Sequence, residues 1–121
     1  MQYMLLIYTE EGGWSALSDD DRGRMMKDYG DFTDELRSAG AMVAGDALQP
    51  TTNATTVRVR DDEQVVTDGP FAETKEQLGG YYLIEADSLD DAARWASKIP
   101  GARYGSVEVR PVMQIPAEAR Q

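Results

Sequence analysis

Residues Tyr3 to Thr9 form an unbroken apolar and β-favouring run near the start of the chain. Seven residues are too few for a free-standing helix, so the run predicts a strand. Tyr3, Leu5 and Ile7 would face one side of a sheet, and the intervening residues, which are also apolar, would face the other. A strand of this kind needs cover on both faces, so we expect it near the centre of the sheet.

The next segment predicts a helix that begins at Ser18 and ends at Gly40. Ser18 is a favourable N-cap, and the three aspartates that follow it suit the positive end of the helix dipole. Gly40 supplies the residue that commonly ends a helix. The side chains expected to face the core recur at steps of four, three and four: Met25, Tyr29, Phe32 and Leu36.

The remainder of the chain predicts five more strands, two of which form a hairpin, and a second helix. Ser88 begins this helix and Pro100 follows its end. Its apolar stripe comprises Leu89, Ala92, Trp95, Ala96 and Ile99. The predicted strands are residues 42–48, a hairpin of 55–60 with 64–67, then 80–86 and 105–112.

This order predicts an α+β fold: a ferredoxin-like βαββαβ sandwich with an inserted β-hairpin that extends the sheet and leaves one of its own faces in water. We expect a single domain over residues 1–113 and a polar C-terminal tail over 114–121. Two helices cover only one face of such a sheet, yet Tyr81 and Leu83 add apolar side chains to the other. A second copy of the chain is the simplest cover, which predicts a two-fold homodimer.

Composition excludes several classes of site. The chain carries 22 acidic and 12 basic residues, a formal net charge of −10, which disfavours nucleic acid as a partner. Without Cys or His it has no thiolate or imidazole ligand, so we expect no metal site and no cofactor. The N-terminus does not resemble a signal peptide, and no apolar run reaches the roughly 20 residues of a membrane helix, which predicts a cytoplasmic protein without a membrane partner.

One segment combines turn chemistry with surplus charge: residues 67–86 are TDGPFAETKEQLGGYYLIEA. Asp68, Gly69 and Pro70 have a local explanation as a turn, with Phe71 as its expected anchor in the core. Thr74 with Gln77 resembles a capping box that opens one short helical turn, ended by a pair of glycines. The surplus charges are Glu73, Lys75 and Glu76.

The charges in this segment have two interpretations. They form a solvated loop, or Lys75 or Glu73 lies over a pocket as an anion anchor or proton carrier. Asp68 likewise faces either the backbone or a ligand.

Two further residues are candidates for a ligand site. Arg110 and Glu108 would point to the dimer side, where an ion pair would hold the register, or Arg110 would orient a carboxylate ligand. Trp14, in a polar loop, would cap a pocket or cover the sheet edge.

The chain resembles the DGPF branch of the YCII-related domain family. The resemblance rests on the segment above and on YMLLIY, ALQPTTNATTVRVR and GSVEVRPV, which together cover almost the whole chain. It implies a dimeric α+β barrel with a pocket between sheet and helices, and a gene neighbourhood shared with extracytoplasmic-function sigma factors. Some relatives are enzymes, including a dehalogenase that uses a His-Asp pair.

At the positions of the His-Asp pair used by the dehalogenase, the resemblance implies different residues in this chain. The histidine position falls on Tyr29, and the acidic partner falls near Asp46. A Tyr-Asp pair could bind or polarise a carbonyl, but a tyrosine with a pKa of about 10 is a weak base at neutral pH. Tyr29 also lies on the apolar stripe, which favours a core role with a satisfied hydroxyl.

Two functional hypotheses follow. The first is a dimeric protein that binds a small molecule or accompanies a sigma factor as a regulator. The second is a cofactor-free enzyme acting on a small anionic metabolite by lyase or dehalogenase-like proton transfer, with Tyr29, Asp46, Asp68 and Lys75 as the residues to test. The missing histidine favours the first.

Overall fold

The computed structural model describes residues 1–116; the end of the predicted polar tail, residues 117–121, lies outside them. The elements in chain order are β1 (Gln2–Thr9), α1 (Gly12–Ala16), α2 (Asp19–Ser38), β2 (Met42–Ala47), η1 (Thr51–Asn53), β3 (Thr55–Arg60), β4 (Glu63–Asp68), β5 (Gln77–Glu85), α3 (Leu89–Ser97), η2 (Pro100–Arg103) and β6 (Ser106–Pro111). The predicted α+β class is therefore confirmed.

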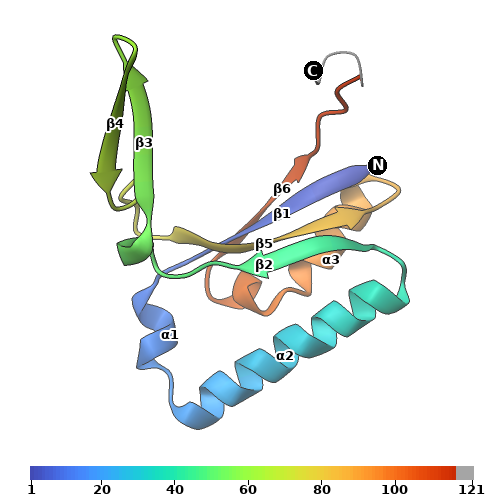
Figure 1. The fold of residues 1–121 in the computed structure, drawn as a ribbon. Coiled ribbons are helices and arrows are strands. Elements are labelled where there is room, and N and C mark those ends of the chain that lie inside the picture. The colour runs from blue at the N-terminus through green and yellow to red at the C-terminus, as the bar shows by residue number, and fades with distance from the viewer. Residues whose placement is uncertain (117–121) are drawn as a thin grey trace.

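Four of the strands form one antiparallel sheet in the order β2-β5-β1-β6, which is consistent with a ferredoxin-like fold. The first predicted strand is β1, and it lies inside the sheet as expected. Both long helices, α2 and α3, lie on the same side of this sheet (Figure 1).

Both helices begin and end as the sequence predicts. Ser18 Oγ accepts a hydrogen bond of 3.1 Å from the Asp21 amide, and Ser88 Oγ caps α3 in the same way. These caps satisfy amides that the first helical turn leaves without an internal partner. Gly40 follows α2 with a φ of 71°, a conformation that costs glycine little.

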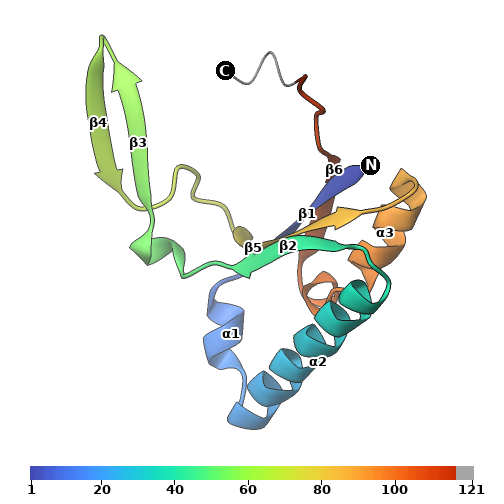
Figure 2. The same ribbon diagram turned by 45° about the vertical axis from the view of Figure 1, so that its right-hand side comes forward.

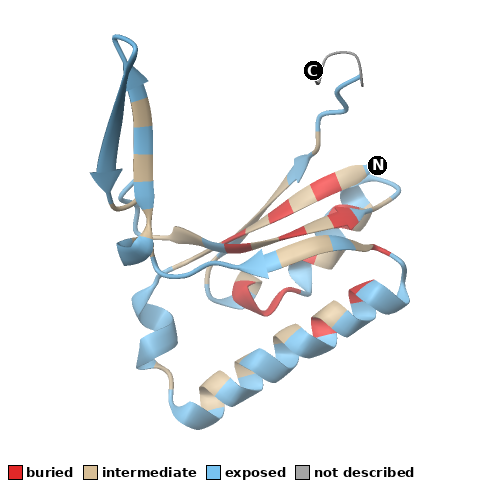
Figure 3. Ribbon diagram, in the orientation of Figure 1, coloured by how far each residue is buried: buried red, intermediate tan, exposed pale blue. Residues whose placement is uncertain are grey.

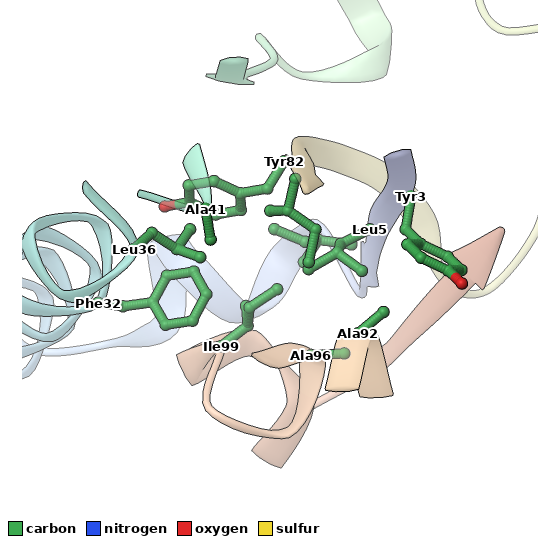
Figure 4. Packing of buried hydrophobic residues seen from close by; sticks show 11 residues of the cluster. Tyr3, Leu5, Phe32, Leu36, Ala41, Tyr82, Ala92, Ala96 and Ile99 are labelled. Carbon is green, nitrogen blue, oxygen red and sulfur yellow. The ribbon is translucent and has the colours of Figure 1, made fainter. Parts of the chain in front are cut away.

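The core lies between the helices and the sheet face that they cover. Leu5, Leu36, Ile84 and Ile99 are fully buried there. The Phe32 ring meets the Tyr82 ring edge to face, with 5.1 Å between centroids (Figure 4). The predicted stripe of α2 is confirmed, but Leu89 is exposed, because it is the first residue of α3 and precedes the buried positions.

The other face of the sheet carries none of the helices found in residues 1–116, and we call it the open face. Its side chains are identified by strand alternation and cross-strand pairing, and they are partly exposed or exposed (Figure 3). The open face comprises Gln2, Met4, Leu6, Tyr8, Ala44, Asp46, Leu78, Tyr81, Leu83, Glu85, Ser106, Glu108 and Arg110.

The predicted hairpin is present as β3 and β4, but it does not extend the main sheet. It forms a separate two-stranded sheet, which we call the arm (residues 55–68). In both views it rises on the side of the open face (Figures 1 and 2). The chain leaves β2 through η1, where the Glu11 carboxylate accepts hydrogen bonds from the amide and the hydroxyl of Thr51. This connection directs the hairpin away from the free edge of β2.

Three local predictions are wrong. Phe71 is 77% exposed and lies 5.5 Å from the Arg58 guanidinium instead of anchoring in the core. No helical turn forms at Thr74, because Gln77 already begins β5 and pairs with Thr9. The loop around Trp14 contains the short helix α1, which the two glycines at its start concealed.

Candidate functional site

Tyr29 occupies a structural position on the covered side of the sheet. Its hydroxyl accepts a hydrogen bond of 3.1 Å from the Gly101 amide. Burial raises the pKa of the Tyr29 phenol above its ordinary value, so the group keeps its proton at neutral pH. Tyr29 packs against the core. It is therefore poorly suited to act as a base.

Asp46 lies at the end of β2 on the open face, the opposite side of the sheet from Tyr29. The two residues that would replace the family's catalytic pair are therefore not brought together. Asp46 instead pairs with Tyr81 on β5, whose hydroxyl donates to Asp46 Oδ2 at 2.7 Å. This bond and the negative charge of Asp46 raise the pKa of the Tyr81 phenol.

The Asp46–Tyr81 pair stands in a row of side chains that crosses the sheet. Tyr81 lies between Asp46 on β2 and Leu6 on β1, and Leu6 is followed by Glu108 on β6. Strands lie about 4.8 Å apart, so the backbones of Asp46 and Glu108, on the two edge strands, are about 14 Å apart. The row is apolar in the middle and acidic at both ends.

The sequence did not single out Tyr81 as a site residue. Its alternation with Tyr82 does indicate that the two rings face opposite sides of the sheet. The partner could not be found, since Asp46 is 35 residues away and only the β2–β5 register brings the two together.

The site residues predicted between positions 67 and 76 do not come together in one site. Asp68 ends β4 and is exposed, opposite Thr55 at the base of the arm. Gly69 has a φ of 100°, as the turn requires. Glu73 is exposed, and Lys75 lies 3.4 Å from the Glu10 carboxylate as an exposed ion pair. An exposed pair of this kind contributes little to stability.

Arg110 and Trp14 also take up positions apart from the Asp46–Tyr81 pair. Arg110 Nε donates to Glu108 Oε2 at 2.8 Å, so the predicted ion pair forms, within one chain and on the open face. Trp14 lies on α1 and is exposed, and its carbonyl accepts from Arg22. Within residues 1–116, no hydrogen bond or ion pair joins any two of the seven predicted site residues.

Two surface grooves of about 480 Å³ each lie on the helix side of the molecule. The first runs between the end of α2 and α3, and the second between α2 and η2. Their charges largely neutralise one another: Arg94 pairs with Asp91, and Lys98 lies 2.5 Å from Glu35 and over the Trp95 ring. Neither groove contains any of the seven predicted site residues.

Within the described residues, no three acidic side chains are grouped in a way that could hold a metal ion. None of the helices over residues 1–116 is both long enough and apolar enough to cross a membrane.

Comparison with known proteins identifies the family. The model of the YCII-related domain matches residues 1–116. An uncharacterised protein of Rhizobium meliloti (strain 1021), R00369, is 43% identical over 114 residues, which cover 93% of this chain and 92% of that protein. The chain therefore belongs to the YCII-related domain family.

Proposed function

We propose that this protein is a cytoplasmic homodimer that binds a small molecule on the open face of its sheet, with Asp46 and Tyr81 as the polar anchor. The observation that carries the proposal is the 2.7 Å hydrogen bond from the Tyr81 hydroxyl to Asp46, next to the apolar side chains of Leu6 and Leu83. Binding sites are commonly apolar with a few well-placed polar groups.

The protonation of the pair suggests which ligands it would take. The Tyr81 hydroxyl already donates its hydrogen bond to Asp46. The raised pKa of Tyr81 means that the phenol stays protonated at neutral pH. What the pair can offer a ligand is acceptors: the second carboxylate oxygen and the phenol lone pair. A ligand with an amine or hydroxyl at one end and an apolar body would match both the pair and its surroundings. A cationic amine would gain the charge of Asp46 as well.

Dimerisation through the open face supplies the enclosure that a single copy lacks. A shallow surface surrounds little of a ligand, whereas effective sites bury most of it. The open face also carries little unpaired charge for a chain with a net charge of −10. Glu108 pairs with Arg110 and Glu85 with the N-terminal ammonium, which leaves Asp46 without a cationic partner among the described residues. Two copies stacked on this face would form the dimeric α+β barrel that the family resemblance implies.

The enzymatic alternative has less support. Tyr29, Asp46, Asp68 and Lys75 lie on different parts of the molecule, and the pKa values of the tyrosines at positions 29 and 81 are raised, which opposes proton abstraction near neutral pH. The Lys75 ammonium, expected to hold an anion, is partnered by Glu10. The regulatory role beside a sigma factor stays a prediction from the family resemblance.

A thermal-shift assay with matched probes tests the ligand class. Benzylamine, benzyl alcohol and benzoate share one apolar body and differ in the polar end. We expect benzylamine to raise the melting temperature most, benzyl alcohol less and benzoate not at all. Asp46→Asn should abolish the shift with benzylamine, because it removes the charged acceptor. Tyr81→Phe should reduce the shift, because it removes the phenol oxygen and the hydrogen bond that orients the Asp46 carboxylate.

Two variants serve as controls. Tyr104→Phe removes an exposed phenol from the chain segment between η2 and β6, and Lys75→Ala removes the cation first expected to bind a ligand. Both should respond to benzylamine as the wild type does. A shift that survives Asp46→Asn, or a preference for benzoate that Lys75→Ala removes, would contradict the proposal.

A further inference from the structure

The arm has two unlike faces. Cross-strand pairing places Val57 opposite Val66 and Val59 opposite Gln64, so these four side chains share one face, which we call the valine face. Thr55 and Asp68 lie on the same face at the base of the arm. The other face carries Arg58 with Val65 opposite it, and Arg60 with Glu63 opposite it. The charges along the arm lie mainly on this second face.

Among residues 1–116, only the second face of the arm is partly covered by other parts of the chain. Phe71 lies against the Arg58 guanidinium, and Thr56 Oγ1 donates to the Gly69 carbonyl at 2.9 Å. On the valine face, Val57, Val59 and Val66 are 56%, 63% and 55% exposed. A lone two-stranded hairpin is at best marginally stable in water, and here it presents three large apolar side chains to solvent.

Charge and position identify the surface that fits the valine face. The arm rises on the same side of the molecule as the open face (Figures 1 and 2), so one chain presents two uncovered apolar surfaces on one side. A single two-fold operation can bury both, each arm lying on the other copy. Both surfaces have few charges, which matters for two copies that each carry −10.

We propose that the arm is an exchange arm: its valine face packs on the open face of a second copy and closes the site at Asp46 and Tyr81. The site is then composite, with the sheet from one copy and the lid from the other. This inference rests on the dimer of the proposed function, and it adds the claim that the arm contributes to the interface.

Cross-linking tests the contact directly, because the chain has no cysteine of its own. Two single-cysteine variants, Val66→Cys on the arm and Leu6→Cys at the centre of the open face, are made with tags of different size and mixed. A short bis-maleimide should then yield a covalent species that contains one copy of each. Val65→Cys, on the opposite face of the same strand, is the matched control and should yield much less.

A second measurement tests the energetics without cross-linking. Val57→Thr with Val66→Thr keeps two β-branched residues in the strands but makes the valine face polar. By sedimentation equilibrium, we expect the dimer dissociation constant to rise at least about tenfold, given the apolar area that two valines bury. Val65→Thr should leave it close to the wild-type value.

The outcomes separate this inference from the proposed function. If the wild type is a monomer, the proposed dimeric function and the exchange arm are both wrong. If Leu6→Asp abolishes the dimer while the Val57→Thr, Val66→Thr variant dimerises as tightly as the wild type, the sheet contact stands and the exchange arm is wrong. Equal cross-linking from positions 65 and 66 would also overturn the inference.

Discussion

The two faces of the four-stranded sheet are built from alternate residues of the same strands, yet they differ in how they are covered. Leu5 is fully buried beneath the helices, whereas its neighbour Leu6 lies partly exposed on the open face. Tyr82 and Tyr81 repeat the contrast on β5. An apolar alternation along a strand therefore indicates that a side chain favours burial, but it does not show whether the same chain or a second molecule buries it.

Adjacent leucines give the largest test of this comparison. Leu5→Ala should lower the free energy of unfolding by about 2–5 kcal/mol, because it leaves a cavity in the closed core. Leu6→Ala should cost about 1 kcal/mol in the single copy, since part of that side chain is already in water. Urea denaturation of both variants measures the two values.

The same experiment at two protein concentrations sharpens the comparison. Below the dissociation constant of the dimer, the cost of Leu6→Ala should fall to its single-copy value, and above it the cost should grow. The cost of Leu5→Ala should stay large in both conditions. Equal costs for the two leucines at every concentration would show that the faces do not differ as described.

The neighbouring tyrosines of β5 allow the same comparison of covered and open face, with a smaller expected effect on stability. Tyr82 Oη donates to Thr33 Oγ1 at 2.9 Å, since the Thr33 hydroxyl itself donates to the Tyr29 carbonyl. Tyr82→Phe should therefore destabilise the protein by about 1 kcal/mol. Below the dissociation constant of the dimer, Tyr81→Phe should change the unfolding free energy by less than about 0.5 kcal/mol, because its hydrogen bond lies at the surface of the single copy. A reversal of this order, measured by urea denaturation, would contradict the assignment of the two rings.

Local patterns explain what the sequence could predict. The caps at Ser18 and Ser88, the stop at Gly40 and the stripe of α2 each depend on residues a few positions apart, and all are confirmed. Alternation along β1 and β5 also predicted an open apolar face. Such features need no knowledge of the tertiary fold.

The wrong predictions concern partners that are distant in the sequence. An isolated Phe71 in a polar loop does not specify what it packs against, and here it meets Arg58 of the arm. The helical turn predicted at Thr74 does not form, because Gln77 pairs with Thr9 in the sheet. The Asp46–Tyr81 pair depends on strand register, which periodicity does not give.

The arm turn gives a smaller effect, confined to one region. Asp61 and Asp62 have φ values of 54° and 64°, the left-handed conformation of a two-residue hairpin turn in which glycine is preferred at the second position. Asp62→Gly should stabilise the arm by a few tenths to about 1 kcal/mol. Asp62→Ala, without a polar side chain, should weaken it.

Hydrogen exchange can locate these changes. The amides of β3 and β4 should exchange more slowly in Asp62→Gly and faster in Asp62→Ala, while those of β1 and β5 stay unchanged. Equal changes in the main sheet would mean that the arm and the sheet open together rather than as separate units.

The smallest effect on stability comes from ionisation of the two perturbed phenols, one on each side of the sheet. The pKa of Tyr29 is raised mainly by burial, and that of Tyr81 mainly by its hydrogen bond to Asp46. A phenol whose pKa rises on folding stabilises the folded state below pH ~10 and loses that contribution as the pH rises through the raised pKa. Asp46→Asn should therefore move the titration of Tyr81 to lower pH and leave that of Tyr29 in place.

Ultraviolet titration of the phenolates, taken as the difference between wild type and variant, measures this shift. Glu108→Gln removes a carboxylate from the opposite edge of the open face and should leave the curve unchanged, because that side chain is bound to Arg110 and not to a phenol. If Asp46→Asn leaves the alkaline curve of the wild type intact, the hydrogen bond that anchors the candidate site is absent in solution. If Tyr29→Phe removes the transition that Asp46→Asn shifts, the perturbed phenol belongs to the covered face and the two sides have been assigned the wrong way round.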